Sequence, residues 1–120
     1  MVRNIAMVTA LLLVLATPGR AVDDEGRFFV RAAGAYSCER WMTASAEEKV
    51  GAEHWWAGYM TAANRFTPDT YDILGSTSVD TMNGMLLRLC AAEPNQLFAI
   101  AVHKALEQLH AQRTRKSPGR

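Results

Sequence analysis

Cys38 and Cys90 are the only two cysteines in this chain of 120 residues, and both follow a segment with the features of a secretory leader. In an exported chain of this size, two thiols far apart in sequence usually form one disulfide. In the chain-entropy model, a bond that closes a loop of roughly 50 residues adds about 4 kcal/mol of stability. A pair of reduced core cysteines is the alternative. The ligand spacing of a zinc site and the C-x-x-C spacing of a redox pair are both absent.

Residues 1–21 have the three parts of a secretory signal peptide. Arg3 supplies the positive charge, residues 5–16 form an uncharged apolar run, and Gly19-Arg20-Ala21 places small residues before a cleavage site. The apolar run is shorter than the roughly 20 residues that span a membrane, although an uncleaved N-terminal anchor is the alternative. We therefore expect export to the periplasm, cleavage near Ala21 and no stable membrane insertion.

The mature chain has a nearly balanced charge. Loss of Arg3 and Arg20 with the leader leaves 11 basic against 12 acidic residues, a net charge of −1. This balance argues against a nucleic-acid partner or a polybasic membrane surface. The basic residues of the C-terminal end cluster in residues 113–120, which we expect to form a disordered, solvated tail. Contact of this tail with anionic lipid headgroups is the alternative.

Helical periodicity runs through most of the mature chain. A short helix around residues 38–43 is expected to hold Cys38 and bury Trp41. Ser45-Ala46-Glu47-Glu48 is a capping box, which predicts a helix from residue 46 to residue 66 that stops before Thr67-Pro68. Its apolar face is predicted from residues at three- and four-residue steps: Ala52, Trp56, Tyr59, Met60 and Ala63.

The second half of the chain predicts a loop and two more helices. Residues 68–76 form the loop, with Tyr71, Ile73 and Leu74 turned inward. A capping signal at residues 77–80 opens a helix that leads into Cys90 and yields near Glu93-Pro94, with apolar residues Val79, Met82, Leu86 and Leu89. Gly84 within this helix indicates close packing against another backbone.

Pro94 suits the first turn of the last helix, and Arg113 is placed in its last turn. The apolar face of this helix is predicted from Phe98, Val102, Ala105, Leu106 and Leu109. The β-branched residues are too scattered to predict a sheet. We therefore predict an all-α fold: one small domain over residues 22–112, a bundle of about four helices stapled by one disulfide.

No residue pattern indicates catalysis, a metal site or a bound cofactor, so an enzyme is not expected. The three histidines, His54, His103 and His110, are interpreted as surface or boundary residues. Trp55 and Trp56 together suggest a platform on which a ligand could stack. Helical spacing favours the other interpretation, with Trp56 in the core and Trp55 at its boundary.

The ordered features of residues 36–109 resemble the HdeA/HdeB family of periplasmic acid-stress chaperones. The resemblance rests on Y-S-C-E-R-W-M at residues 36–42, W-A-G-Y-M-T-A-A-N at residues 56–64, the segment 72–90 and N-Q-L-F-A-I-A-V-H-K-A-L at residues 95–106. Cys38 and Cys90 fall on the family's disulfide pair, and Gly58-Tyr59 on its second-helix segment. The resemblance covers about three quarters of the mature chain.

This resemblance implies a holdase that works without ATP and binds protein clients. Family members form folded dimers at neutral pH, which implies a homodimer here. In strong acid they dissociate, partly unfold and expose apolar surface to denaturing clients. The residues expected to contact clients or a partner protein are Trp55, Trp56, Tyr59, Met60, Met82, Leu86 and Phe98.

Two other functions fit the same sequence. The protein could bind one specific partner, such as a secreted toxin that it neutralises, with Trp55 or Trp41 as the anchor of a fixed exposed patch. It could also be an envelope protein with no separable activity. A specific binder should keep its shape in acid, whereas a holdase should lose tertiary order.

Overall fold

The computed structural model describes residues 22–119, so the predicted leader at residues 1–21 and the final Arg120 lie outside the described part. Within that part the helical elements follow in the order η1 (Ala32–Ala35), α1 (Cys38–Met42), α2 (Ala46–Phe66), α3 (Val79–Ala92), α4 (Phe98–Leu109) and η2 (His110–Gln112). Residues 22–119 contain no strand beyond two isolated bridges, Ser37 with Leu97 and Asp72 with Thr114. The prediction of an all-α fold with about four helices and one disulfide is confirmed.

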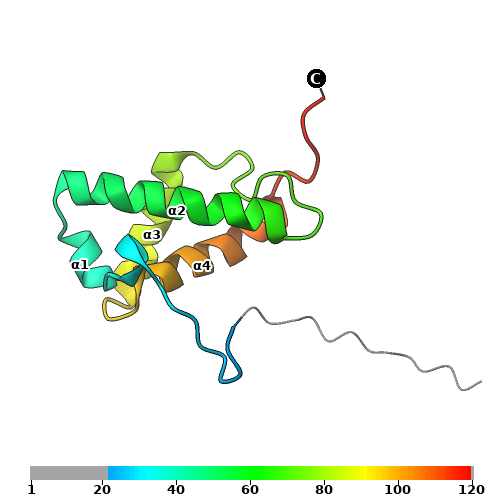
Figure 1. Cartoon of the computed structure of the whole chain (residues 1–120). Coiled ribbons are helices and arrows are strands. Elements are labelled where there is room, and N and C mark those ends of the chain that lie inside the picture. The colour runs from blue at the N-terminus through cyan, green and yellow to red at the C-terminus, as the bar shows by residue number, and fades with distance from the viewer. Residues whose placement is uncertain (1–21, 120) are drawn as a thin grey trace, which may run out of the picture.

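The long helix α2 runs the length of the helical domain, with α4 beside it and α1 packed at the end where α2 begins (Figure 1). Its start has the predicted capping box, because Ser45 Oγ accepts from the Glu48 backbone and Glu48 Oε2 accepts from the Ser45 backbone. Its end falls at Phe66, immediately before Thr67-Pro68. Both predicted bounds of α2 are therefore confirmed.

One apolar core lies between the helices. Trp56 on α2, Met82 and Leu86 on α3, and Phe98 and Val102 on α4 are all fully or almost fully buried. The core contains no buried polar or charged residue among those described. The fold therefore separates apolar from ionisable side chains, because burial of a charged side chain costs much free energy.

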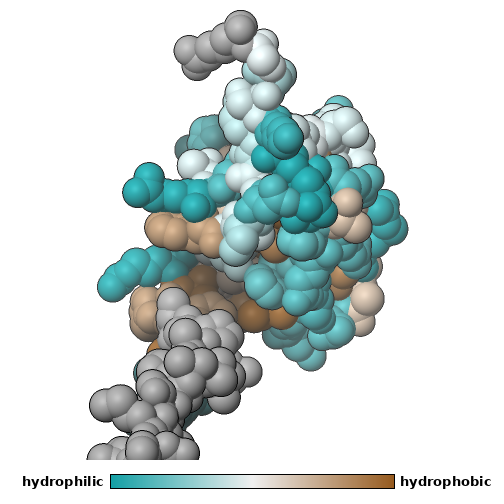
Figure 2. Space-filling view, turned by 90° about the vertical axis from the view of Figure 1, so that its right-hand side faces the viewer, coloured by the Kyte–Doolittle hydropathy of each residue, from teal (hydrophilic) through white to brown (hydrophobic). Residues whose placement is uncertain are grey.

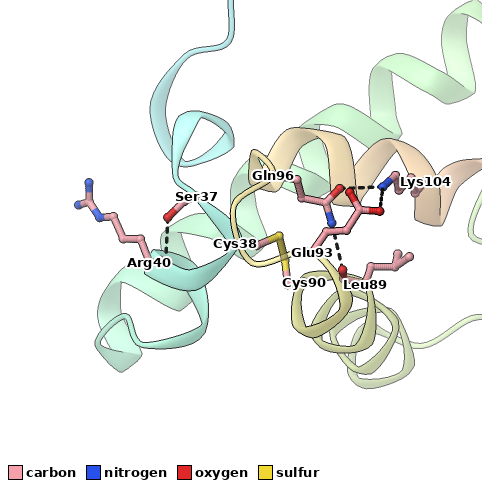
Figure 3. The surroundings of a disulfide bond; sticks show 8 residues. All are labelled: Ser37, Cys38, Arg40, Leu89, Cys90, Glu93, Gln96 and Lys104. Atoms are coloured by element: carbon pink, nitrogen blue, oxygen red, sulfur yellow. Dashed lines mark hydrogen bonds and ion pairs between the residues drawn. A yellow bond between two sulfur atoms is a disulfide. The ribbon is translucent and has the colours of Figure 1, made fainter.

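The disulfide joins α1 to α3 inside this core. Cys38 and Cys90 are both fully buried, and their Cα atoms are 4.9 Å apart. Figure 3 shows Gln96 beside the bond: its amide donates to the Leu89 carbonyl at 3.0 Å and accepts from Lys104 Nζ at 2.9 Å. The segment between α3 and α4 is thereby fixed to both helices.

The start of the last helix differs from the prediction. Pro94 does not lie in its first turn; α4 begins at Phe98, and Pro94 belongs to the preceding turn. The reason is a long-range contact, in which the Pro94 and Gln96 carbonyls accept from the backbone N–H groups of Glu39 and Cys38 at 2.9 and 2.8 Å. These bonds satisfy N–H groups in the first turn of α1 that have no partner within the helix.

The first two residues of the expected solvated tail, Arg113 and Thr114, pack on the domain, whereas residues 115–119 are exposed. Arg113 lies beyond α4 and η2, and its side chain is buried against the 68–76 loop. Its guanidinium donates to the Asp69 carbonyl, Thr70 Oγ1 and the His110 carbonyl at 2.7–3.2 Å. Thr114 exchanges backbone hydrogen bonds with Asp72. The folded domain thus extends past residue 112, because the loop carbonyls need donors that this segment supplies.

Tyr71, predicted to turn inward, and Val79, one of the apolar residues at helical spacing, both lie at the surface. Tyr71 is 51% exposed, whereas Ile73 in the same loop is fully buried. The Ile73 N–H donates to Asn64 Oδ1 at 2.7 Å, which turns Ile73 towards the core and leaves Tyr71 outside. Val79 is 44% exposed because it is the first residue of α3 and precedes the part of that helix that meets the core.

Candidate functional site

Five of the seven residues predicted to bind clients or a partner lie in the core. Trp56, Met60, Met82, Leu86 and Phe98 are each at most 2% exposed. The prediction that Trp56 is a core residue is confirmed. In the folded state these side chains are closed to any protein partner. They become available only if the helices separate.

The remaining two, Trp55 and Tyr59, lie at the boundary of the core. Their rings stack with centroids 5.6 Å apart, and Trp55 also packs beside Phe98 with centroids 6.2 Å apart. One side of the Trp55 indole lies against Gly34 of η1, at a distance where a β-carbon would overlap the ring. The sequence signal for this contact is the run of small residues at 32–35, which lies outside the helical periodicity.

Trp41 does not provide an exposed anchor for a partner. Only 7% of the residue is exposed, and its ring packs against Phe98 with centroids 4.8 Å apart. The expectation that the first helix buries Trp41 is confirmed, and the alternative role as an exposed anchor is wrong. Trp55 is half-buried, so part of this residue remains accessible.

A hydrogen-bonded relay that the sequence did not reveal connects α2 to α3. Trp56 Nε1 donates to Asn83 Oδ1 at 3.1 Å, and Asn83 Nδ2 donates to Glu53 Oε2 at 3.1 Å. The relay satisfies the buried indole N–H, as burial of tryptophan requires. It also fixes the half-buried Glu53 carboxylate.

Near the relay, α1, α2 and α3 enclose a groove of about 320 Å³. We call it the Leu87 groove; it is lined by Trp41, Met42, Lys49, Val50, Glu53, Asn83, Gly84 and Leu87. Gly84 does not pack closely against another backbone, because a β-carbon there would meet only the end of the Arg88 side chain at 3.7 Å. The predicted close approach at Gly84 is therefore wrong, and the glycine opens a groove instead.

A second apolar surface lies along α2 and α4. Here Tyr59 and His103 are joined by a hydrogen bond of 2.9 Å between the Tyr59 hydroxyl and His103 Nδ1. Burial, and then the negative charge of Glu107, raise the pKa of Tyr59 above its usual value of 10.0. The tyrosine therefore remains a neutral hydroxyl at any pH at which the protein would normally be found.

Exposed phenylalanines extend this second surface. Phe28 and Phe29 precede η1 and Phe66 ends α2, and Phe29 is 82% exposed. Figure 2, which faces the end of α2, shows apolar residues gathered on one side of the molecule below a largely hydrophilic surface. Tyr59 and His103 line two hollows, of about 300 and 520 Å³. Apolar surface of this kind is typical of contact with another molecule.

Two exposed carboxyl groups are stabilised in their ionised form. The backbone N–H of Ser45 and then the Arg40 guanidinium hold the pKa of Glu48 below its ordinary value of 4.5. The backbone N–H of Arg27 does the same for Asp23, lowering its pKa below 3.8. Both groups favour the folded state only while they are ionised.

The described residues include no group of three or more His, Cys, Asp or Glu side chains arranged to hold a metal ion. No helix among residues 22–119 is both long and apolar enough to cross a membrane. Comparisons with protein-family models, with curated proteins and with solved structures found no match for this chain.

Proposed function

We propose that the protein is a periplasmic holdase of the acid-stress type, which binds denaturing proteins without ATP. The observation that supports this function best is the separation of apolar from ionisable groups. Trp56, Met60, Met82, Leu86 and Phe98 form a closed apolar core, and no charged residue among those described lies in it; the buried side chain of Arg113 lies under the 68–76 loop instead. A change in surface charge can therefore open the core without first breaking a buried ion pair.

Acid supplies that change in charge. Protonation of 12 carboxylates and three histidines takes the side-chain charge of the mature chain from −1 to +14. Self-repulsion of this size favours expanded states of a small domain. The core residues then become accessible to the apolar segments of clients.

The carboxyls with lowered pKa contribute to the same transition. Because the folded-state pKa of Glu48 lies below 4.5, its ionised form stabilises the fold at higher pH. This contribution is lost as the pH falls through the lowered pKa, when the carboxyl is protonated in the folded state as well. The stabilisation from Asp23 is likewise lost as the pH falls through its lowered pKa, which lies below 3.8.

The disulfide limits the expansion. It joins α1 to α3, so the segments on either side of α2 stay tethered after the core opens. A tethered chain keeps its apolar segments close together and refolds with less loss of conformational entropy. Both cysteines are fully buried in the folded domain.

The test is light scattering of an acid-sensitive enzyme, such as citrate synthase, at about pH 2–3 and at pH 7, with oxidised or reduced mature protein. Oxidised protein is expected to suppress scattering at or below an equimolar ratio in acid only. Equal suppression at pH 7 would show that acid does not control the activity. Bovine serum albumin at equal mass serves as the control for non-specific protection.

A second candidate is a protein that binds one specific partner in its folded form. The exposed Phe28 and Phe29, together with the half-buried Trp55 and Tyr59, favour this candidate, because aromatic clusters at a surface are typical of protein interfaces. Such a protein would keep its tertiary structure in acid and protect no client. The scattering experiment separates the two candidates.

A further inference from the structure

The Leu87 groove has the composition of a site for a small ligand. Trp41, Met42, Val50 and Leu87 give it apolar walls, and its volume of about 320 Å³ lies within the range of ligand sites. Val50 and Leu87 face it from α2 and α3, and each is 52% exposed. Aliphatic side chains that remain half in water on two facing helices gain from a molecule that covers both.

One fixed negative charge lies in this apolar groove. The Glu53 carboxylate is held by Asn83, which the Trp56 indole holds in turn, so its position is set by the packing of α2 on α3. Glu53 forms no ion pair with any cation in the described part of the chain. Lys49 also lines the groove, one helical turn away, but lies at the exposed rim.

Gly84 supplies an independent reason to regard the groove as a site. A glycine inside a helix destabilises it relative to alanine. Nothing in the fold requires one at this position, since a β-carbon would make only ordinary van der Waals contact, at 3.7 Å, with the end of the Arg88 side chain. Because residue 84 has no side chain, a molecule in the groove can contact the α3 backbone directly.

We infer that the Leu87 groove binds an apolar primary amine. The hydrocarbon part lies between Val50 and Leu87 and covers Gly84, and the ammonium group donates to the Glu53 carboxylate. A charge-assisted hydrogen bond of this kind is strong when one partner is already fixed and partly shielded from water. The site belongs to the folded protein at neutral pH. It is therefore independent of the acid-induced holdase activity, in which the same helices separate.

Matched probes test the chemistry. Phenethylamine, 2-phenylethanol and 3-phenylpropanoate share one apolar body and differ in their polar end. Binding is measured at pH 7 by amide chemical-shift changes in the folded protein. Phenethylamine is expected to shift the amides of Val50, Gly84 and Leu87 and to bind about tenfold more tightly than the alcohol. Equal affinity of the alcohol, or tighter binding of the carboxylate through Lys49, would overturn the proposal.

Matched variants test the residues. Glu53→Gln keeps an oxygen that can accept from Asn83 but removes the charge, so the preference for the amine should disappear. Glu47→Gln makes the same change on the same helix outside the groove and should leave the preference intact. Loss of the preference in both variants would show that general surface charge, and not the groove, attracts the amine.

Gly84→Ala gives the sharpest test, because stability and binding should change in opposite directions. The variant should melt about 4–8 °C higher, since alanine favours the helix, and should bind phenethylamine at least about tenfold more weakly. Gly58→Ala, at an open helical position outside the groove, should also melt higher and bind as the parent does. Unchanged binding in Gly84→Ala would contradict the proposed site even if the Glu53 variant failed to fold.

Discussion

The indole of Trp55 lies against the backbone of Gly34, in a position that a β-carbon at residue 34 would occupy. This contact attaches η1 to α2 and places the half-buried Trp55 between Gly34 on one side and Tyr59 on the other. The chain before α1 is therefore part of the packed domain. Residue 34 has to be glycine because there is no space for a side chain between the two elements.

Gly34→Ala should consequently destabilise the protein. The added methyl group has to displace the rigid indole, and overpacking of this kind costs about 1–3 kcal/mol. Urea unfolding followed by tryptophan fluorescence measures the loss. Gly58→Ala is the control, because its β-carbon would enter open space and should raise the stability of α2. A neutral Gly34→Ala would show that η1 does not pack on Trp55 in solution.

Trp56→Ala is expected to lower the free energy of unfolding by about 3–5 kcal/mol, the usual range for removing a large buried side chain. It also leaves Asn83 Oδ1 without its indole donor. Trp55→Ala removes the same side chain from the boundary and should cost clearly less. If Trp56→Ala lost less than about 1 kcal/mol while remaining fully folded, Trp56 would lie outside the core. The interpretation of the two tryptophans as a ligand platform would then gain support.

Cleavage of the signal peptide and formation of one disulfide together predict a defined mature form. Intact mass of periplasmic protein should show a chain beginning near Val22 and lacking two hydrogens, as one disulfide between Cys38 and Cys90 requires. Replacing both cysteines by serine should cost about 2–5 kcal/mol. Alkylation of two free thiols in native and unfolded protein would contradict this framework.

Because Arg113 is packed against the domain, Arg113→Ala is expected to destabilise the protein. The variant leaves the Asp69 and His110 carbonyls and the Thr70 hydroxyl without their guanidinium donor, so a loss of about 1–3 kcal/mol is expected. Lys116→Ala, on the exposed residues that follow, should change stability by less than about 0.5 kcal/mol. Identical unfolding curves for the two variants would restore the interpretation of residues 113–120 as a solvated tail.

Local signals in the sequence were sufficient to predict α2, the helical fold class and the buried position of Trp56. The bounds of α2 depend on Ser45, Glu48 and Pro68, all of which act within a few residues. The start of α4 could not be predicted in this way. The carbonyls of Pro94 and Gln96 accept from Glu39 and Cys38, which are more than fifty residues earlier in the chain.

The same distinction applies to the candidate sites. Periodicity separated core Trp56 from boundary Trp55, because both lie on one helix. The relay from Trp56 through Asn83 to Glu53 depends on how α2 packs against α3, and no local pattern specifies that arrangement. For Gly84, sequence reasoning detected the unusual residue but assigned the wrong cause. Only the packed structure shows that the glycine faces a groove.

The most direct test of the proposed function is an acid titration that follows near-ultraviolet circular dichroism and protection of citrate synthase in the same samples. Tertiary structure is expected to be lost, and protection to appear, over one common pH interval below about 4.5, where the carboxylates are protonated. Retained near-ultraviolet signal down to about pH 2, with the client aggregating as it does alone, would contradict the proposed holdase function.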